Sequence, residues 1–391
     1  MSGTLTLPAF DFNQRTRLVY GAGSLQQLPA LVREYSGSTV LLVTDAGLQR
    51  AGHCERAAKV LTDAGITCHV YDRVQENPDS AHVEALTQFA RPLGVDMLIG
   101  LGGGSSLDCA KGANFLLTNG GRIHDYKGIG RATKPMLPML AIPTTSGTGS
   151  EAQSFAVIAD AETHLKMACG DVKAACRVAL LDPELTLTMP RSVTAATGID
   201  AMTHAIESYV STKRNSISQM FAHRAWQLLS RSFRTVLEQP EHLEARGGMQ
   251  VGAFLAGAAI ENSMLGAAHA TANPLTAHFG TTHGHAVGLM LPHVIRWNAV
   301  EVDELYADLA AVAGWGSAND GESAGTTLAE GFTELLRLAG MPVSVAESSG
   351  QTATETLIRE LAEDAAQQWT GTFNPRPMDV DSFAQLYSQA F

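Results

Sequence analysis

The sequence predicts an α/β domain with a parallel sheet in residues 1–188, followed by an all-helical domain in residues 189–391. Up to about residue 181, short apolar runs alternate with helical segments at the spacing typical of βαβ units. From about Pro190 onward, apolar residues recur at helical spacing and no segment has a strand pattern. The length of 391 residues also favours two domains, because it exceeds what one small core needs.

In the first domain, residues 1–20 alternate weakly between apolar and polar and could supply one or two edge strands. Gly21 and Gly23 precede a leucine-containing helix, for which Ser24 is a plausible N-cap. The continuous apolar runs that follow are typical of strands buried in a parallel sheet. The expected strands cover residues 38–44, 67–71, 96–101, 139–142 and 179–181. The expected helices cover residues 50–64 and 80–90, and a third ends near Leu117.

In the second domain, two apolar stripes indicate helices that pack into a core. The first consists of Met220, Phe221, Trp226, Leu229 and Phe233. The second consists of Leu328, Phe332, Leu335 and Leu338. Further helices are expected near residues 352–369 and 379–390.

The composition argues against several classes of partner. A formal charge of −12 disfavours nucleic acid and anionic membranes. The apolar stretches are too short to span a bilayer, and residues 1–20 lack the pattern of a signal peptide. The five cysteines show no CxxC spacing, which suits a reducing compartment. We therefore expect a cytoplasmic protein that has neither a nucleic-acid nor a membrane partner.

Asp200 and His204 lie four residues apart in a predicted helix, so their side chains leave the same face. A carboxylate and an imidazole placed in this way form half of a divalent-metal site. Further donors are available, because five of the 13 histidines fall within a short later segment: His269, His278, His283, His285 and His293. The alternative interpretation is a surface carboxylate and a hydrogen-bonded histidine that share a helix face.

Two glycine-containing loops follow predicted strands. In the first, Gly102-Gly103-Gly104-Ser105-Ser106 leads from a strand into a helix, where free N–H groups and the helix dipole favour a phosphate. Leu107 replaces the third glycine of GxGxxG, and no Walker A motif is present. The second loop, residues 143–151, contains hydroxyls and glycines that could bind another part of the same nucleotide. Each loop alone could be a turn without a ligand, but the pair favours a nucleotide site.

Taken together, these motifs resemble the iron-dependent, or group III, alcohol dehydrogenases over nearly the whole chain. The resemblance is carried by residues 102–108, 142–151, 200–207, 266–269, 282–284 and 291–293. It implies a dinucleotide-binding α/β domain and a helical metal-binding domain, a plan shared with dehydroquinate synthase. It also implies that Fe²⁺ or Zn²⁺ is held by four ligands: Asp200, His204, His269 and His283.

The resemblance further implies that the cofactor is NAD. The implied cofactor-binding residues are Asp45, Asn77, Gly102, Gly103, Gly104, Ser105, Ser106, Asp108, Thr144, Thr145, Thr148 and Lys166. Asp45 matches the position at which an acid accepts hydrogen bonds from the adenosine ribose and repels a 2′-phosphate.

One position departs from the family pattern. Asn273 stands four residues after His269, where relatives commonly carry a second histidine. An amide cannot take up a proton, so the proton relay attributed to that histidine needs another route. Water with the cofactor ribose could provide it, or His285, the nearest imidazole by sequence. Asn273 itself either contacts substrate or satisfies a neighbouring backbone group.

The expected function is a metal-dependent oxidoreductase that transfers hydride between a nicotinamide cofactor and a primary or secondary alcohol, or the corresponding aldehyde or ketone. One alternative is a metal- and NAD-dependent lyase of the dehydroquinate synthase type. Another is a non-catalytic scaffold that retains the fold. We also expect a homodimer or a higher homo-oligomer.

Overall fold

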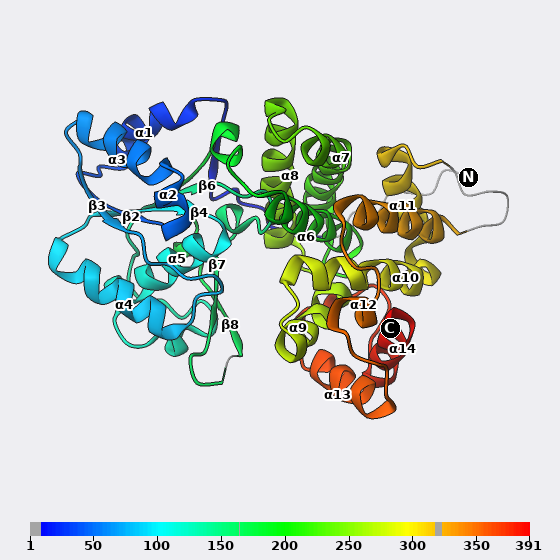
Figure 1. Ribbon diagram of the computed structural model, residues 1–391. Coiled ribbons are helices and arrows are strands. Elements are labelled where there is room, and N and C mark those ends of the chain that lie inside the picture. The colour runs from blue at the N-terminus through cyan, green and yellow to red at the C-terminus, as the bar shows by residue number, and fades with distance from the viewer. Residues whose placement is uncertain (1–8, 164, 317–322) are drawn as a thin grey trace. The chain divides into compact units, whose positions relative to one another are not determined.

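The computed structural model describes residues 9–163, 165–316 and 323–391, which form two compact units. The first unit runs without interruption from Asn13 to Met189 (Figure 1). The second comprises Pro190–Phe391 together with residues 9–12. Each unit has its own buried hydrophobic core.

The first unit contains a six-stranded parallel sheet with strand order β1-β9-β6-β4-β2-β3. Its strands are β1 Arg17–Tyr20, β2 Thr39–Val43, β3 Thr67–Tyr71, β4 Met97–Gly102, β6 Met139–Pro143 and β9 Val178–Leu181. The central strands β4 and β6 are buried throughout, as their continuous apolar sequences predict. This sheet confirms the predicted α/β fold class.

Helices cover both faces of the sheet, and successive residues of β2 alternate between them. Val40 and Leu42 pack with α1 and α3, whereas Leu41 and Val43 pack with α4 and α5. The helices of this unit are α1 Leu28–Glu34, α2 Ala46–Arg50, α3 His53–Asp63, α4 Ser80–Ala90 and α5 Gly104–Asn119.

The structure adds a second sheet that the sequence patterns did not predict. It consists of β5 Gly128–Ile129, β8 Lys166–Gly170 and β7 Phe155–Ala159, and β7 and β8 pair in antiparallel fashion. Strand β5 has only two residues, both exposed, and exposure varies along β7 and β8, so none of the three is buried throughout as β4 and β6 are.

The N-terminal segment departs from expectation in one detail. Residues 1–8 lie outside the described residues, and β1 forms one edge of the large sheet. The prediction that Ser24 is an N-cap is wrong, because Gly23 occupies the N-cap of a 3₁₀ helix that begins at Ser24. Asp182 supplies the missing acceptor instead, since its carboxylate accepts from the N–H groups of Gly23 and Leu25.

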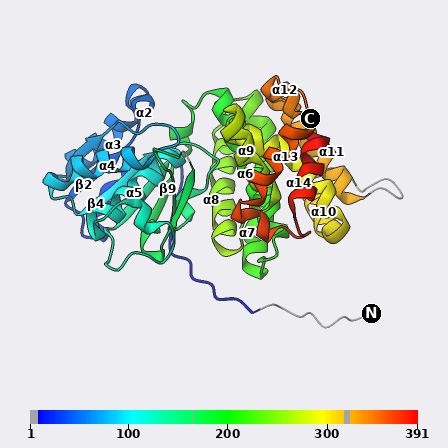
Figure 2. The same ribbon diagram turned by 90° about the horizontal axis from the view of Figure 1, so that it is seen from below.

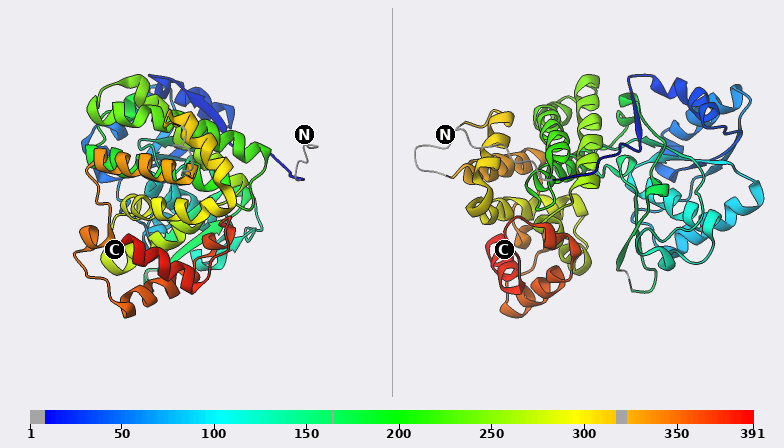
Figure 3. Two further views of the ribbon diagram at one scale, coloured as in Figure 1. Left: turned by 90° about the vertical axis from the view of Figure 1, so that its right-hand side faces the viewer. Right: turned by 180° about the vertical axis from the view of Figure 1, so that it is seen from behind.

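Among its described residues the second unit contains helices and no strand, which confirms the predicted architecture. Figure 3 shows its helices packed together, and Figure 2 shows α14 alongside α10. The helices are α6 Arg191–Val210, α7 Ser216–Glu238, α8 Leu243–Asn262, α9 Ala267–Phe279, α10 His283–Ala313, α11 Ala324–Ala339, α12 Val345–Ser349, α13 Glu355–Ala366 and α14 Val380–Ala390.

Helix α6 lies in the interior of this unit, and every residue from Gly198 to Val210 is buried. It packs against α7, α8 and α10. Its buried polar side chains therefore need partners within the protein or a bound ion, because an isolated buried charge is costly.

Among the described residues, no single helix has both the length and the apolar composition that a membrane span requires. Helices α8 and α9, which are bent by 106° relative to each other, meet these criteria only when they are taken as a pair.

Candidate functional site

Three helices of the second unit bring four predicted metal ligands together. Helix α6 presents Asp200 and His204 one turn apart, α9 presents His269 in its first turn, and α10 begins at His283. The Oδ1 atom of Asp200 lies 3.3 Å from Nε2 of His204, 3.5 Å from Nε2 of His269 and 3.7 Å from Nε2 of His283. One carboxylate oxygen thus faces three imidazole nitrogens.

The donor set fits a divalent cation. Donor atoms of Asp200, His269 and His283 lie within 4.8 Å of one another. The ring of His204 stacks on that of His269 with centroids 4.8 Å apart. Within the described part of the chain, Oδ1 of Asp200 and Nε2 of His269 are enclosed and lack a well-formed hydrogen bond. Carboxylate oxygen and imidazole nitrogen suit Fe²⁺ and Zn²⁺ alike.

The electrostatics of the cluster also favour a cation. Burial raises the pKa of Asp200, but the neighbouring His204, His269 and His283 outweigh burial and hold the pKa well below its usual range. Burial lowers the pKa of His269, but Glu207 and Asp200 raise it to about 9. A bound divalent ion would replace the proton that His269 otherwise holds between two carboxylates.

The residue patterns did not single out Glu207, which contacts the His269 ring at Nδ1, the nitrogen that does not face Asp200. Its Oε2 atom lies 2.5 Å from Nδ1 of His269, and its Oε1 accepts from the N–H of Ala268 at 2.6 Å. A carboxylate on Nδ1 places the proton there and leaves Nε2 as a lone-pair donor. The available signal was its position three residues after His204 and seven after Asp200, on the inner face of the same helix.

The two predicted catalytic residues lie on the ligand-bearing helices. Asn273 is on α9, one turn after His269, and its Nδ2 donates to Oε1 of Gln368 at 2.9 Å. Its partner is therefore a side chain rather than a backbone group. His285 is half-buried in the first turn of α10, and burial lowers its pKa. No hydrogen bond joins the His285 ring to another described residue. The catalytic roles of Asn273 and His285 stay predictions.

In the first unit, the two predicted nucleotide loops contact each other. Strands β4 and β6 are neighbours, and Gly102 pairs with Pro143 where the loops begin. A Cβ atom on Gly104 would lie 2.7 Å from Cγ2 of Thr148, and one on Gly103 would lie 3.3 Å from Thr145. Side chains are thus excluded from the surface that the loops share.

The start of α5 is suited to an anion. Gly103 is its N-cap and provides no side-chain acceptor, so the first N–H groups are available to a phosphate. Gly102 has a φ of +149°, a conformation that favours glycine. The Oγ atom of Ser105 accepts from the N–H of Asn77, which has a φ of +50°. Ser106 and Thr144 are buried beside these residues.

Asp45 follows β2 and caps α2. Its Oδ1 atom accepts from the N–H groups of Gly47 and Leu48 at 2.7 and 3.1 Å. No hydrogen bond joins Oδ2 to another described residue. One oxygen of Asp45 is therefore structural, and the other can accept from a ligand hydroxyl.

Asp108 and Lys166 have surroundings that the motifs did not predict. Oδ1 of Asp108 accepts from Oγ of Ser150 at 2.5 Å, and its Oδ2 accepts from the N–H of Val157 at 3.1 Å. This carboxylate ties α5 to the second loop and to β7. Lys166 begins β8, where it pairs with Ala159. Contacts of Asp108 and Lys166 with a cofactor stay predictions.

Sequence reasoning also missed Lys111, which is completely buried on α5. Its ammonium donates to the carbonyl and Oγ of Ser150 and to the carbonyls of Gln153 and Phe155, at 2.6–2.9 Å. These bonds anchor the end of the second loop to the helix that the first loop begins. An alternation pattern alone gives no signal for such a residue, because lysine is almost never fully buried without partners.

Comparisons with known proteins agree with this geometry. The family model for iron-containing alcohol dehydrogenase matches residues 15–183, and the model for the C-terminal region of the Fe-containing alcohol dehydrogenase family matches residues 194–391. The chain is 32% identical to the NAD-dependent methanol dehydrogenase of Bacillus methanolicus, over 95% of this chain and 97% of that protein.

Solved structures show the same similarity. A crystal structure of 1,3-propanediol oxidoreductase matches with a TM-score of 0.93 and 32% identity, over 98% of this chain and 100% of that one. Sulfoacetaldehyde reductase from Bifidobacterium kashiwanohense in complex with NAD⁺ matches with a TM-score of 0.87 and 26% identity, over 98% and 99% of the chains.

Proposed function

Because the chain belongs to the iron-containing alcohol dehydrogenase family and is therefore an oxidoreductase, we propose that two sets of residues carry its reaction. The helical unit holds a divalent metal ion, and the α/β unit holds NAD. The reaction transfers hydride between the nicotinamide ring and an alcohol or the corresponding aldehyde or ketone. We propose residues 1–188 as the dinucleotide-binding domain and residues 189–391 as the metal-binding domain.

The proposed metal ligands are Asp200, His204, His269 and His283, with Fe²⁺ as the first choice and Zn²⁺ as the second. A divalent cation at this position would supply a Lewis acid for the oxygen of the substrate. Asp200 contributes the one negative charge of the ligand set, and Glu207 keeps the lone pair of His269 directed at the site. The proposal is supported by the 3.3–3.7 Å distances from Asp200 to the three imidazoles.

The proposed diphosphate site is the segment from Gly102 to Ser106. It is supported by the uncapped start of α5 and by the close packing of Gly103 and Gly104 against the second loop. Thr144, Thr145 and Thr148 offer hydroxyls from that loop. The remaining proposed cofactor contacts are Asp45, Asn77, Asp108 and Lys166.

The substrate loses a hydroxyl proton as well as a hydride when an alcohol is oxidised. We propose that Asn273 orients the substrate or a water molecule, and that water or His285 carries the proton. The Asn273–Gln368 bond supports an orienting role, because it holds the amide in one direction one turn beyond His269.

The single observation that carries the proposed function is the convergence of one carboxylate and three histidines from three helices. The decisive experiment is metal analysis of anaerobically purified protein, followed by a screen of alcohols, diols and hydroxyacids by NADH absorbance. We expect about one metal ion per chain. We also expect NADH to form in a one-to-one ratio with the alcohol oxidised, for at least one alcohol. A lyase would regenerate NAD within each turnover, and a scaffold would give no turnover, so either result would overturn the proposal.

We further propose a cytoplasmic homodimer or higher homo-oligomer. Large apolar side chains are exposed around the small sheet, where Ile129 is 72% and Leu165 65% accessible, with Val172 at 54%. Exposed apolar side chains of this size suit contact with a second copy. All five cysteines are unpaired, as a reducing compartment requires. Light scattering at several concentrations tests assembly, and a purely monomeric protein would contradict it.

A further inference from the structure

The first turn of α9 takes its caps from distant parts of the chain. Its N-cap, Gly266, has no side chain, so the leading N–H groups need acceptors from elsewhere. Oε1 of Glu207 accepts from the N–H of Ala268 at 2.6 Å, and Oδ1 of Asn374 accepts from the N–H of Ala267 at 3.3 Å. His269 is the next residue, so these two caps bear directly on its position.

Position 266 leaves little room for a local side-chain cap. A Cβ atom on Gly266 would lie 3.0 Å from Oε1 of Glu207 and 3.1 Å from Oδ1 of Asn374. A serine or aspartate N-cap at position 266 would therefore crowd the two groups that now do the capping and force them to shift by a few tenths of an ångström. The sequence has a glycine here because the acceptors come from α6 and from the segment between α13 and α14.

Asn374 is held in place by an amide pair in the core. Its Nδ2 donates to Oδ1 of Asn298 at 2.7 Å, and Nδ2 of Asn298 donates back to Oδ1 of Asn374 at 3.0 Å. Asn298 is 1% and Asn374 3% accessible. Because Asn298 belongs to α10, this pair connects the start of α9 to the helix that begins with His283.

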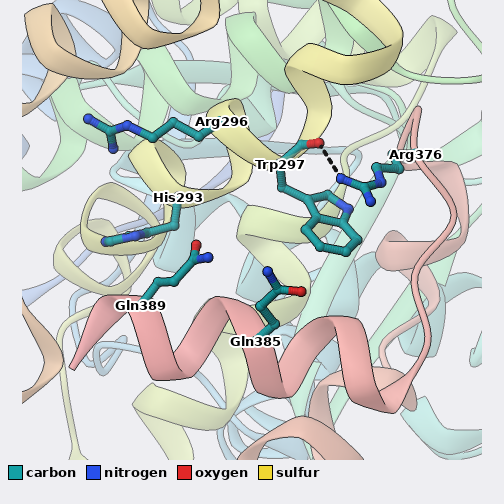
Figure 4. Close-up of a pocket in the computed structure, with 6 residues that line it drawn as sticks. All are labelled: His293, Arg296, Trp297, Arg376, Gln385 and Gln389. Carbon is teal, nitrogen blue, oxygen red and sulfur yellow. Dashed lines mark hydrogen bonds between the residues drawn. The ribbon is translucent and has the colours of Figure 1, made fainter.

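Arg376 provides a second connection between the α13–α14 segment and α10. Its guanidinium donates to the carbonyl of Trp297 at 3.1 Å and lies 3.5 Å from the centre of the Trp297 ring (Figure 4). Nδ2 of Asn374 also donates to the carbonyl of Arg376 at 2.7 Å. Arg376 and Trp297 border a groove of about 490 Å³ between α10 and α14. Asn374 is thus fixed by its own side chain and by the arginine two residues later.

We propose that Asn374 is a positioning residue for the metal site, although it lies 107 residues after Ala267, the first residue of α9. Through Ala267 it fixes the first turn of α9, and through Asn298 it sets that turn against α10. Glu207 makes the matching connection from α6. The three ligand-bearing helices therefore meet at the start of α9. This proposal rests on the metal site proposed above.

The test measures binding of Co²⁺ alone to metal-free protein, by titration and by the absorption spectrum of the bound ion. Asn374→Ala removes the cap, and Asn215→Ala is the matched control. Asn215 caps α7 by accepting from the N–H groups of Ile217 and Ser218, and α7 bears no proposed ligand. Both variants lose one asparagine cap from the same unit, although Asn215 is half-buried and Asn374 is buried. Thermal unfolding of each variant reports how much stability the loss of its cap costs.

We expect Asn374→Ala to weaken Co²⁺ binding by about tenfold or more, as removal of outer-shell partners does, and to shift the absorption bands. Asn215→Ala should keep the wild-type dissociation constant and spectrum. If Asn374→Ala does not fold, Asn298→Ala replaces it, because it leaves the cap in place but removes its support. The weakening should then be smaller but present.

Two results would overturn the proposal, and they are distinguishable. Wild-type protein that takes up no Co²⁺ would remove the metal site itself. Wild-type protein that binds Co²⁺, beside an Asn374 or Asn298 variant with the same dissociation constant and spectrum, would leave the metal site standing and remove the positioning role.

Discussion

Gly284, the second residue of α10, offers a sharp test of how the metal site is built. A Cβ atom at this position would lie 2.2 Å from the carbonyl oxygen of Ala196 on α6 and 2.7 Å from its carbonyl carbon. Both colliding atoms belong to the backbone, so they cannot rotate away as side-chain atoms do. We therefore expect Gly284→Ala to push α10 away from α6.

The size of the effect follows from the geometry. Real Cβ contacts are essentially never shorter than 3.0 Å, so the helices must separate by at least 3.0 − 2.2 = 0.8 Å. The separation acts beside His283, whose Nε2 lies 3.7 Å from Oδ1 of Asp200. Overpacking of this kind costs about 1–3 kcal/mol in stability. A misplacement of about 1 Å can cost ~100-fold in rate, so we expect kcat/KM to fall at least about tenfold.

The assay combines urea unfolding, metal content and steady-state NADH formation. Gly252→Ala is the matched control, because a Cβ there would lie 2.7 Å from Cγ of Leu229, between α8 and α7. This control should lose stability but keep its kcat/KM. If Gly284→Ala kept wild-type metal content and a kcat/KM within about twofold of wild type, the backbone contact would not set the position of His283.

Four further outcomes are expected. His269→Ala should lose metal, measured by elemental analysis, and nearly all turnover while far-UV circular dichroism shows a folded chain; full activity after chelator treatment would contradict this. Asp45→Asn keeps an oxygen that can cap α2 but removes the charge, so the ratio of kcat/KM for NAD over NADP should fall; a wild type that already uses both equally would refute it. Burial raises the pKa of Glu151 from 4.5 to about 7, so its contribution to stability is present below 4.5 and lost as the pH rises through 7. Glu151→Gln should therefore raise the free energy of urea unfolding by ~1–3 kcal/mol at about pH 8 and by much less at about pH 5, and equal effects at both would count against the shift. Asn273→His should change substrate preference or the pH profile of kcat more than it changes metal content; if it alters neither, Asn273 is structural.

The sequence revealed those features whose signal is local. Continuous apolar runs marked β2, β4 and β6, because strands buried on both faces tolerate no polar alternation. Asp200 and His204 were recognisable because both lie on one helical face. The glycine loop was recognisable because strand, glycine turn and helix follow one another directly.

Features that depend on contacts between distant residues gave no such signal. Glu207 and Asn374 act on the start of α9 from 61 and 107 residues away. The carboxylate of Asp182, rather than Ser24, caps the first 3₁₀ helix from the end of the neighbouring strand β9. Short strands such as β5 form only because a neighbour supplies hydrogen bonds. Spacing rules describe one element at a time, so they cannot reveal an acceptor on another element.

The continuity of the α/β unit has a consequence for how the chain is made. Asn13–Met189 is complete before the ribosome has added Asp200, so this unit can fold while the rest is still being synthesised. The helical unit is completed later, because the Asn374 cap of α9 is added 107 residues after Ala267. Residues 9–12 can pack only after the helical unit has been synthesised, since the Phe12 ring contacts the ring of Phe221 on α7. We expect fragments that end near residue 200 to be protease-resistant over the α/β unit, and tight metal binding to require a chain that includes Asn374.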